Sequence, residues 1–447
     1  MTDRQDGTGI ESCDVLVIGG GPAGSTAATL LARQGHKVIA LEKEHHPRFH
    51  IGESLLPMNL PVFERLGVLE KVRALGVYKR GADFEADNER GYNTYAFSEV
   101  LGQSPPHAFQ VWRQDFDRML FEHARETGAD AREGHEVVRA EQTGPRETWL
   151  DVRADDGRAY RIRAGYVVDA SGRDTFFSSR KKLKRKNPQH QSAAIFGHFR
   201  DVVRREGEDA GNISIYSFAH GWMWLIPLPD GVTSVGAVCR PEYLKQRKGP
   251  ARDFLLATLQ ANPAMAERMK HAELVDGRVH ATGNYAYDST RMGGRGWVMV
   301  GDAFAFLDPV FSSGVYLAMS GAEQAAAVVD RALREPRREM RLLHALEKRQ
   351  RKGMRRFAFF IYRFNGPAMQ WLFRNPSRKW DMEKGVTSML AGDVFDNFAV
   401  WWRLQLFRAI YLVCVLRDRR GWLAERRLRL AQAKNRFTGG TLPVDRD

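Results

Sequence analysis

The sequence is poor in cysteine: its 447 residues include only Cys13, Cys239 and Cys414, far apart from one another. Three residues so spaced form neither a disulfide framework nor a metal site, so we expect a reducing compartment and no resident metal. Residues 1–13 also lack the basic start and the apolar run of an export signal. The sequence therefore predicts a cytoplasmic protein.

An unbroken apolar run long enough to cross a membrane is also missing. The most apolar segment, residues 398–416, contains Arg403 and Arg408, which leave eight apolar residues before Arg417. A spanning helix needs about 20 such residues, so we predict no transmembrane segment. Two interpretations of this segment stay open: a basic amphipathic helix lying on a membrane and, the one we favour, a helix that covers an aromatic pocket.

Charge is plentiful but unevenly placed. Residues 331–447 hold 27 Lys and Arg against 11 Asp and Glu, so this quarter carries essentially all of the net charge of +14. Such a region either attracts an acidic partner or is a solvated helical face, and the sequence favours neither. The basic run RKKLKRK at 180–186 lies in no recognisable nucleic-acid module with stacking aromatics, so we expect no nucleic-acid binding.

The apolar pattern predicts an α/β fold with more than one unit. Residues 14–42 read as strand, glycine turn, helix and strand, and residues 191–240 as several antiparallel strands joined by Pro and Gly turns. Only helical patterns occur beyond residue 330. We therefore expect a Rossmann-like domain, an inserted antiparallel β-sheet substrate domain and a C-terminal helical region. Their expected extents are 12–78, 111–185 and 280–330 for the first, 79–110 and 186–279 for the second, and 331–447 for the third.

A glycine fingerprint opens the first helix. Gly19, Gly21 and Gly24 follow a strand in the pattern G-x-G-x-x-G, which allows a tight turn and a close backbone approach to a pyrophosphate at the helix N-terminus. Glu42, at the end of the second strand, is placed to accept hydrogen bonds from the hydroxyls of an adenosine ribose. A tight turn without a ligand is the alternative. The combination predicts dinucleotide binding.

Three further segments indicate which dinucleotide this is. PRFHIGESLLP at 47–57, GWVMVGDAF with Asp302, and DPVFSSGV at 308–315 together resemble the FAD-dependent monooxygenase superfamily of the para-hydroxybenzoate hydroxylase type. The resemblance implies FAD, with a helix N-terminus that stabilises the negative charge of the reduced flavin. The cofactor contacts implied by these segments and by the arginine of QVWRQDF are Arg48, Gly52, Glu53, Ser54, Arg113, Asp302, Pro309, Gly314 and Val315.

Two motifs, W-x-W-x-I-P at 222–227 and F-x-x-P-x-x-S-x-G at 306–314, resemble those of the flavin-dependent halogenases. The resemblance implies that the tryptophans separate the flavin chamber from the substrate and that chloride or bromide binds near the second motif. The alternative for the tryptophans is structural, because residues i and i+2 of a strand point to the same side. The implied tunnel residues are Trp222, Trp224, Ile226 and Pro227, and the implied halide residues are Ser312, Ser313 and Gly314.

Lys79 matches the catalytic lysine of that family, which stands at the start of a strand in the context K-x-G-x-x-F. Hypohalous acid is a diffusible oxidant that must be held near one carbon of the substrate. An ammonium group can hydrogen-bond it and a neutral amine can be N-halogenated by it, and burial that lowers the lysine pKa allows either route. A lone lysine is otherwise a solvated surface residue.

The family resemblance implies a halogenase that uses reduced FAD and oxygen, similar to members acting on phenols, pyrroles and carrier-bound acyl groups. The chain shows one dinucleotide fingerprint, so a separate flavin reductase is expected to supply reduced FAD. The basic C-terminal region would suit an acidic acyl or peptidyl carrier protein. The alternatives are an FAD-dependent monooxygenase, an oxidoreductase resembling the geranylgeranyl reductases, and a non-catalytic FAD-binding or membrane-associated protein.

Overall fold

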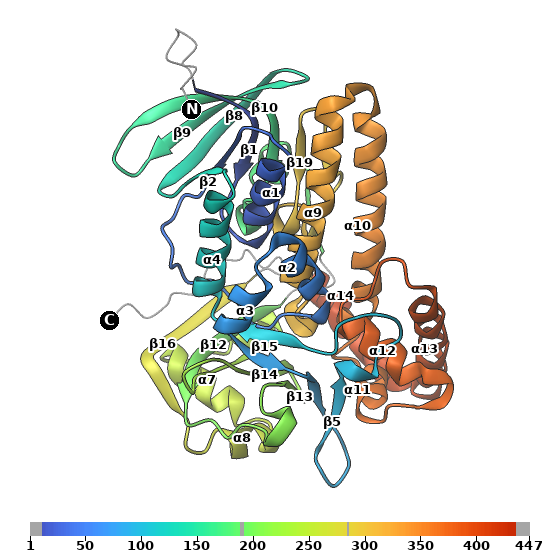
Figure 1. The fold of residues 1–447 in the computed structure, drawn as a ribbon. Helices are drawn as coiled ribbons and strands as arrows, with labels where there is room; N and C mark the ends of the chain where they lie inside the picture. The colour runs from blue at the N-terminus through green and yellow to red at the C-terminus, as the bar shows by residue number, and fades with distance from the viewer. Residues whose placement is uncertain (1–10, 188–191, 284–285, 435–447) are drawn as a thin grey trace.

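The computed structural model describes residues 11–187, 192–283 and 286–434, which form the predicted mixed α/β protein (Figure 1). Most of the segment 1–13, from which the missing export signal was inferred, lies outside the described residues. Two large sheets, one above the other in Figure 1, are flanked by long C-terminal helices.

The first large sheet has eight strands in the order β18-β19-β10-β1-β2-β7, extended by β9 on β10 and by β8 on β9. β1 pairs in parallel with β2, as the predicted strand–helix–strand unit requires, and on its other side in parallel with β10. All four residues of β2 are buried, as is typical of a parallel strand covered on both faces. The strands are β1 (Glu11–Ile18), β2 (Val38–Leu41), β7 (Asp130–Arg132), β8 (His135–Gly144), β9 (Glu147–Ala154), β10 (Ala159–Asp169), β18 (Gly293–Gly294) and β19 (Trp297–Met299).

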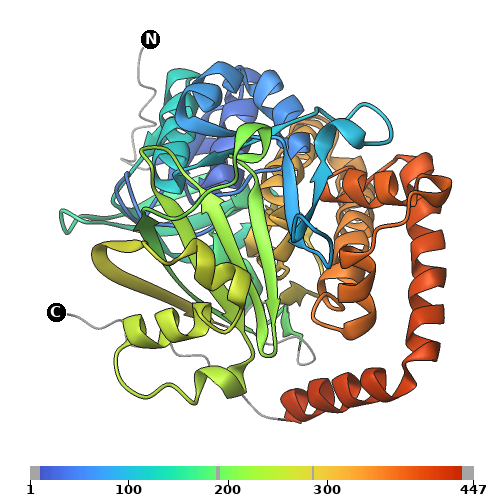
Figure 2. The same ribbon diagram turned by 90° about the horizontal axis from the view of Figure 1, so that it is seen from below.

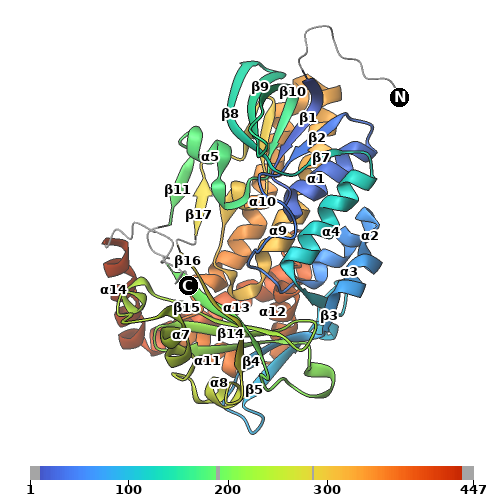
Figure 3. The same ribbon diagram turned by 90° about the vertical axis from the view of Figure 1, so that its left-hand side faces the viewer.

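Helices pack beside this sheet (Figure 3), where α1 contacts both α4 and α9. Alanines at the contact side of α1 and α9, Ala27 and Ala325 among them, are fully buried and allow the helices to approach closely. The helices of this part are α1 (Pro22–Arg33), α2 (Leu60–Leu66), α3 (Leu69–Leu75), α4 (Arg113–Glu126), α5 (Phe176–Arg180) and α9 (Ser313–Arg334).

The second large sheet has seven strands in the order β16-β12-β15-β14-β13-β4-β5, antiparallel except for the parallel pair β13–β4. It confirms the antiparallel strands predicted for 191–240. The strands are β4 (Gly81–Glu85), β5 (Tyr92–Ala96), β12 (Ala193–Arg200), β13 (Ile213–Phe218), β14 (Gly221–Pro227), β15 (Thr233–Cys239) and β16 (Glu273–Gly283), and the helices packed with them are α6 (Pro241–Leu244), α7 (Ala251–Leu259) and α8 (Pro263–Arg268).

Residues of β14 alternate between two different cores. Met223 and Leu225 pack with α7 and α8 on the outer face, whereas Trp222 and Trp224 belong to a core on the inner face. This alternation is the period-two pattern of a strand with both faces buried. The structure therefore turns both tryptophans to the same side, as their spacing predicts.

Two small sheets join the large ones. β3 (Gly76–Lys79) pairs with β6 (Ala108–Val111), and β11 (Lys184–Lys186), β17 (Tyr287–Ser289) and β20 (Ala305–Phe306) form the other. Lys79 is the last residue of β3, so the expectation that it starts a strand is wrong. After Arg80 the chain continues directly as β4 at Gly81, whose close approach to the carbonyl oxygen of Tyr95 leaves no room for a side chain.

The described part of the chain beyond residue 330 contains helices and no strand, as predicted. These are α10 (Glu339–Ile361), α11 (Pro367–Arg374), α12 (Met382–Leu390), α13 (Phe398–Arg417) and α14 (Arg419–Lys434). One hydrophobic core joins them to the inner face of the second sheet: the Phe373 ring packs against Phe84 of β4 at 4.8 Å and stacks on Phe311 at 5.8 Å. The boundaries between the three units stay predictions, and β16 continues across the predicted boundary at 279.

The helix α13 corrects the expectation drawn for 398–416. Its 20 residues, with a mean hydropathy of 1.4 over 18 of them, are long and apolar enough by length and composition to cross a membrane, whereas we expected a segment too short to do so. Arg403 and Arg408 do not interrupt it, because the helix is continuous through both. Only 28% of that apolar stretch is buried in the described structure, so one face of α13 packs in the core and much of the rest is exposed apolar surface.

Candidate active site

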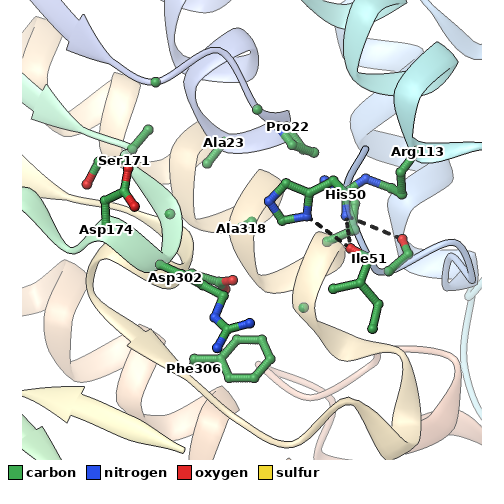
Figure 4. A pocket seen from close by; sticks show the side chains of 18 of the residues that line it. Pro22, Ala23, His50, Ile51, Arg113, Ser171, Asp174, Asp302, Phe306 and Ala318 are labelled. Carbon is green, nitrogen blue, oxygen red and sulfur yellow. Dashed lines mark hydrogen bonds between the residues drawn. The ribbon is translucent and has the colours of Figure 1, made fainter. Parts of the chain in front are cut away.

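A cavity of about 580 Å³ lies between the two large sheets and the N-termini of α1 and α9 (Figure 4). Its volume is within the usual range for a small-molecule or cofactor site. In Figure 4, Asp302, Phe306 and Ser171 stand on one side, and His50, Ile51 and Arg113 on the other. The cavity thus meets the carboxyl ends of β1 and β2, where ligands of open α/β sheets bind.

The turn between β1 and α1 forms one end of this cavity. Gly19 has a φ of +102°, and a Cβ on Gly24 would lie 1.8 Å from the Gly19 carbonyl oxygen, so both positions require glycine. A Cβ on Gly21 would lie no closer than 3.7 Å to any other atom, so packing within the protein does not require glycine here. Gly21 lies instead on the side of the turn that faces the cavity. α1 has no side-chain cap and no acidic residue in its first turn, which leaves its N-terminal amides available to an anion.

Glu42 lies at the end of β2 and is 4% exposed. Its Oε2 accepts hydrogen bonds from the Gly20 amide at 2.7 Å and from the Arg48 guanidinium at 3.1 Å. The carboxylate is thereby fixed at the rim of the cavity, in the position where the fingerprint predicts a ribose contact.

Arg113 begins α4 and faces the cavity beside the loop 48–54. Its guanidinium pairs with the buried Asp117 through two 2.9 Å hydrogen bonds and donates to the Ile51 carbonyl at 2.6 Å. Burial would raise the pKa of Asp117, but the Arg113 charge overcomes it and holds that pKa below its usual value. Arg113 therefore fixes the loop that carries Gly52, where φ is +109°.

Asp302 stands in the short turn Gly301–Ala303 after β19, at the cavity wall. Burial raises the pKa of its carboxyl to about 6, against the opposing charges of Arg173 and Arg113. A carboxyl in this setting can accept hydrogen bonds from a polyhydroxylated chain in the cavity.

The loop before α9 brings the predicted halide residues to the same cavity. Ser312 is the N-cap of α9 and has a φ of +55°, a conformation that non-glycine residues rarely adopt. No side chain caps this helix and no acidic residue lies in its first turn. Ser312 and Gly314 line the cavity, and a Cβ on Gly314 would meet nothing within 4 Å. Ser313 lines a separate small cavity behind the loop.

Trp222 and Trp224 form part of the cavity wall contributed by β14. Their rings are 5.6 Å apart, and the indole N–H of Trp224 donates to the Ser234 hydroxyl at 3.2 Å. Gly236 on the neighbouring strand makes space for this ring, because a Cβ there would lie 2.6 Å from it. Ile226 also lines the cavity, whereas Pro227 does not.

Lys79 is completely buried, which is unusual for a lysine. Its Nζ donates to the Ser54 hydroxyl and to the Leu55 carbonyl, both at 2.9 Å, and lies 5.4 Å from the Phe97 ring centroid. No carboxylate in the described part of the chain neutralises it, so burial lowers its pKa to about 7. Lys79 does not line the cavity. Ser54 does, so the Ser54 hydroxyl lies between the Lys79 amine and the cavity.

The structure adds groups at this cavity that sequence reasoning missed. Glu53 accepts a 2.6 Å hydrogen bond from Nε2 of His198 on β12, and Phe49 stacks on His280 of β16 with ring centroids 4.0 Å apart. Burial lowers the pKa of His50 to about 4, with Arg113 acting in the same direction. His198 and His280 come from strands of the second sheet, and only the sheet order brings them to the loop 48–54, to which His50 itself belongs.

Most predicted site residues meet at this cavity. Gly24, Lys79, Pro227 and Ser313 do not line it. The predicted residues that do line it are Gly19, Gly21, Glu42, Arg48, Gly52, Glu53, Ser54, Arg113, Trp222, Trp224, Ile226, Asp302, Pro309, Ser312, Gly314 and Val315. Among the described residues, no cluster of three or more His, Cys, Asp or Glu is placed to hold a metal ion.

The residues present fit FAD. Two uncapped helix N-termini free of acidic side chains open on one cavity, which suits a ligand with a pyrophosphate at one point and an electron-rich ring edge at another. Glu42 and Asp302 supply acceptors for hydroxyl groups. The space over Gly21 and Gly314 leaves both backbones approachable.

Comparison with known proteins agrees with this geometry. The family described as "FAD binding domain" matches residues 12–359. The flavin-dependent halogenase armH3 of Armillaria mellea is 33% identical over 72% of this chain and 68% of its own. The 1H-pyrrole-2-carbonyl-[peptidyl-carrier protein] chlorinase of Pseudomonas fluorescens is 30% identical over 86% of this chain and 90% of its own.

Among solved structures, the myxobacterial chondrochloren halogenase CndH superposes with a TM-score of 0.75 at 31% identity, over 89% of this chain and 96% of its own. The chain is therefore an FAD-binding enzyme of the flavin oxidoreductase type. It belongs to the flavin-dependent halogenase family.

Proposed function

We propose that the protein installs chloride or bromide on an electron-rich aromatic ring, phenol-like or pyrrole-like, by way of hypohalous acid. The observation that carries this proposal is the buried Lys79, whose amine is bound to the hydroxyl of Ser54 at the wall of the FAD cavity. Reduced FAD and oxygen, when bound, supply the oxidising equivalent for the halide. A reductase or hydroxylase acting through flavin alone has no need of such an amine.

Each group of residues has a role under this proposal. The α1 turn, Glu42 and Arg113 hold the cofactor, and the backbone of the loop 312–314 holds the halide. Trp222 and Trp224 keep the acceptor ring away from the flavin side of the cavity. Lys79 holds the oxidised halogen and directs it at one ring carbon, from which a proton then leaves.

The proposal includes two partners. The chain carries one dinucleotide fingerprint, so a separate flavin reductase supplies reduced FAD in the cytoplasm. The acceptor is either free or tethered to an acyl or peptidyl carrier protein. The relative from Pseudomonas fluorescens, whose name specifies a carrier-bound pyrrole, and the basic residues of 331–447 support the tethered form.

The test is a product assay with purified protein, FAD, NADH and an added flavin reductase. With sodium bromide and a phenol or a pyrrole-2-carboxamide as acceptor, mass spectrometry should find brominated product in proportion to bromide. Omission of reductase or of oxygen should abolish it. Product that is hydroxylated or hydrogenated, and indifferent to halide, would assign the protein to the rival flavin enzymes instead.

A further inference from the structure

The helix α13 presents a long apolar face that no described part of the chain covers. Figure 2 shows α13 along one edge of the molecule, with α14 turning away from its end. The large apolar side chains on this face are between 40% and 71% exposed, and they run over about 27 Å of helix. They are Phe398, Trp401, Leu412, Val413 and Leu416.

The opposite face of α13 is packed on protein. Phe407 meets Phe360 of α10 at 5.0 Å between ring centroids, and Tyr411 meets Phe359 at 5.6 Å. Val400, Leu404 and Val415 are buried on the same side. A helix held along its whole length by its own protein can lie on a bilayer but cannot pass through one.

The two arginines inside α13, Arg403 and Arg408, are turned away from the exposed face. Arg403 donates to the Trp380 carbonyl at 3.3 Å and lies over the Trp402 ring. Arg408 lies over the Phe359 ring, and burial lowers its pKa. From Phe398 to Leu416 no charged side chain is exposed. The exposed face is therefore an apolar ridge with one polar residue in it, Gln405, whose Oε1 accepts a hydrogen bond from Arg408 at 3.2 Å.

Basic side chains gather where the ridge ends. The exposed arginines there are Arg417, Arg419, Arg420, Arg426 and Arg427, against a single exposed acidic residue among the described side chains, Asp418. Leu423 and Leu430 of α14 are exposed among them, seven residues apart and so on one side of the helix. Apolar side chains flanked by arginines form the pattern of a helix at the interface of an anionic membrane.

We propose that α13 and α14 bind the surface of a membrane that contains anionic lipid, with the apolar ridge among the acyl chains and the arginines at the headgroups. A second copy of the chain fits less well, because self-pairing would bring two strongly basic regions together. A soluble acidic protein would pair with the arginines, but these lie at one end of the ridge, whereas protein interfaces surround an apolar centre with a polar rim.

The experiment is cosedimentation of the full chain with vesicles of phosphatidylcholine alone and with phosphatidylglycerol added. We expect binding to the anionic vesicles that 0.5 M NaCl reverses. R417Q/R420Q should weaken it about thirtyfold, at about fivefold per arginine. L412Q/L416Q should weaken it at least about tenfold, because two exposed leucines leave the acyl region.

Matched controls come from the opposite side of the molecule in Figure 1, near α7. K248Q/R252Q removes two exposed cations there, and V203Q removes an exposed apolar side chain from the loop that follows β12. Neither should change vesicle binding. All variants keep the packed face of α13, and unchanged halogenation of a free phenol in solution would show that the site is intact whatever the vesicle result.

Three results would overturn the proposal. The first is no binding to anionic vesicles, or equal binding to neutral ones. The second is binding that L412Q/L416Q leaves intact. The third is a concentration-dependent dimer, or a complex with an acidic carrier protein, that L412Q/L416Q abolishes, since the ridge would then be a protein interface.

Discussion

At the scale of single residues, the proposed halogen transfer depends above all on the buried amine of Lys79. With its pKa near 7, it is close to half protonated at neutral pH, so the ammonium and the free amine are both populated. K79M removes the amine, is shorter than lysine by that one atom only, and suits an apolar environment. We expect it to lower product formation at least about a hundredfold while NADH-driven oxygen consumption continues. Undiminished, regiospecific halogenation by K79M would remove the lysine from the mechanism.

The pH dependence of the wild-type protein should report the same group. The rate of product formation should have an inflection near pH 7 that oxygen consumption lacks, rising with pH if the free amine carries the halogen and falling if the ammonium does. Stability follows from the lowered pKa: between pH 7 and 10.5 the unfolded chain binds a proton that the folded chain lacks. The cost of burying Lys79 is therefore greatest below pH 7, and K79M should raise the melting temperature more at pH 7 than at pH 9.

Sequence reasoning found the cavity residues that lie in contiguous motifs, because motif spacing fixes backbone geometry locally. It could not find the Glu53–His198 pair, since His198 reaches Glu53 only through the order of strands in the second sheet. It also misplaced Lys79 relative to its strand and gave no sign that Ser54 would stand between the amine and the cavity.

At the scale of elements, the glycines of the β1–α1 turn have two different roles: Gly24 is needed for packing within the protein and Gly21 for the approach of the cofactor. G24A places a methyl group on the Gly19 carbonyl and should lower the melting temperature with or without FAD. G21A has room in the protein itself, so it should fold normally but bind FAD at least about tenfold more weakly, because its methyl group lies where the cofactor approaches the backbone. Differential scanning fluorimetry and FAD fluorescence titration measure the two effects. Equal FAD affinity in G21A and wild type would contradict this use of the turn.

Strand and helix types were predictable wherever apolar periodicity was strong, as in the strand–helix–strand unit and the antiparallel strands of 191–240. The helix over the apolar segment 398–416 was predicted as well, but its apolar exposed face was not, because counting charges along a sequence ignores that Arg403 and Arg408 fold back onto aromatic rings. Which face of this 20-residue helix is buried depends on tertiary contacts, and those cannot be read from the periodicity of the sequence.

At the scale of the whole molecule, the C-terminal helices and the second sheet share one core. F373A would empty a site between Phe84, Phe311 and Phe364, so we expect a loss of about 3 kcal/mol in the free energy of unfolding. W371A, two residues earlier on α11 and exposed, should cost less than about 0.5 kcal/mol. Urea denaturation followed by fluorescence compares them. A negligible effect of F373A would mean that the helices are not part of the common core.

The stacking of Phe311 on Phe373 has a bearing on protein engineering. Phe311 immediately precedes Ser312, whose strained backbone begins the loop at the cavity, so the C-terminal helices buttress the loop that would receive the halide. A chimera that takes residues 331–447 from a relative in order to change the acceptor would also alter this contact between Phe373 and Phe311. Residues 309–314 would have to be exchanged together with those helices for halide use to survive the graft.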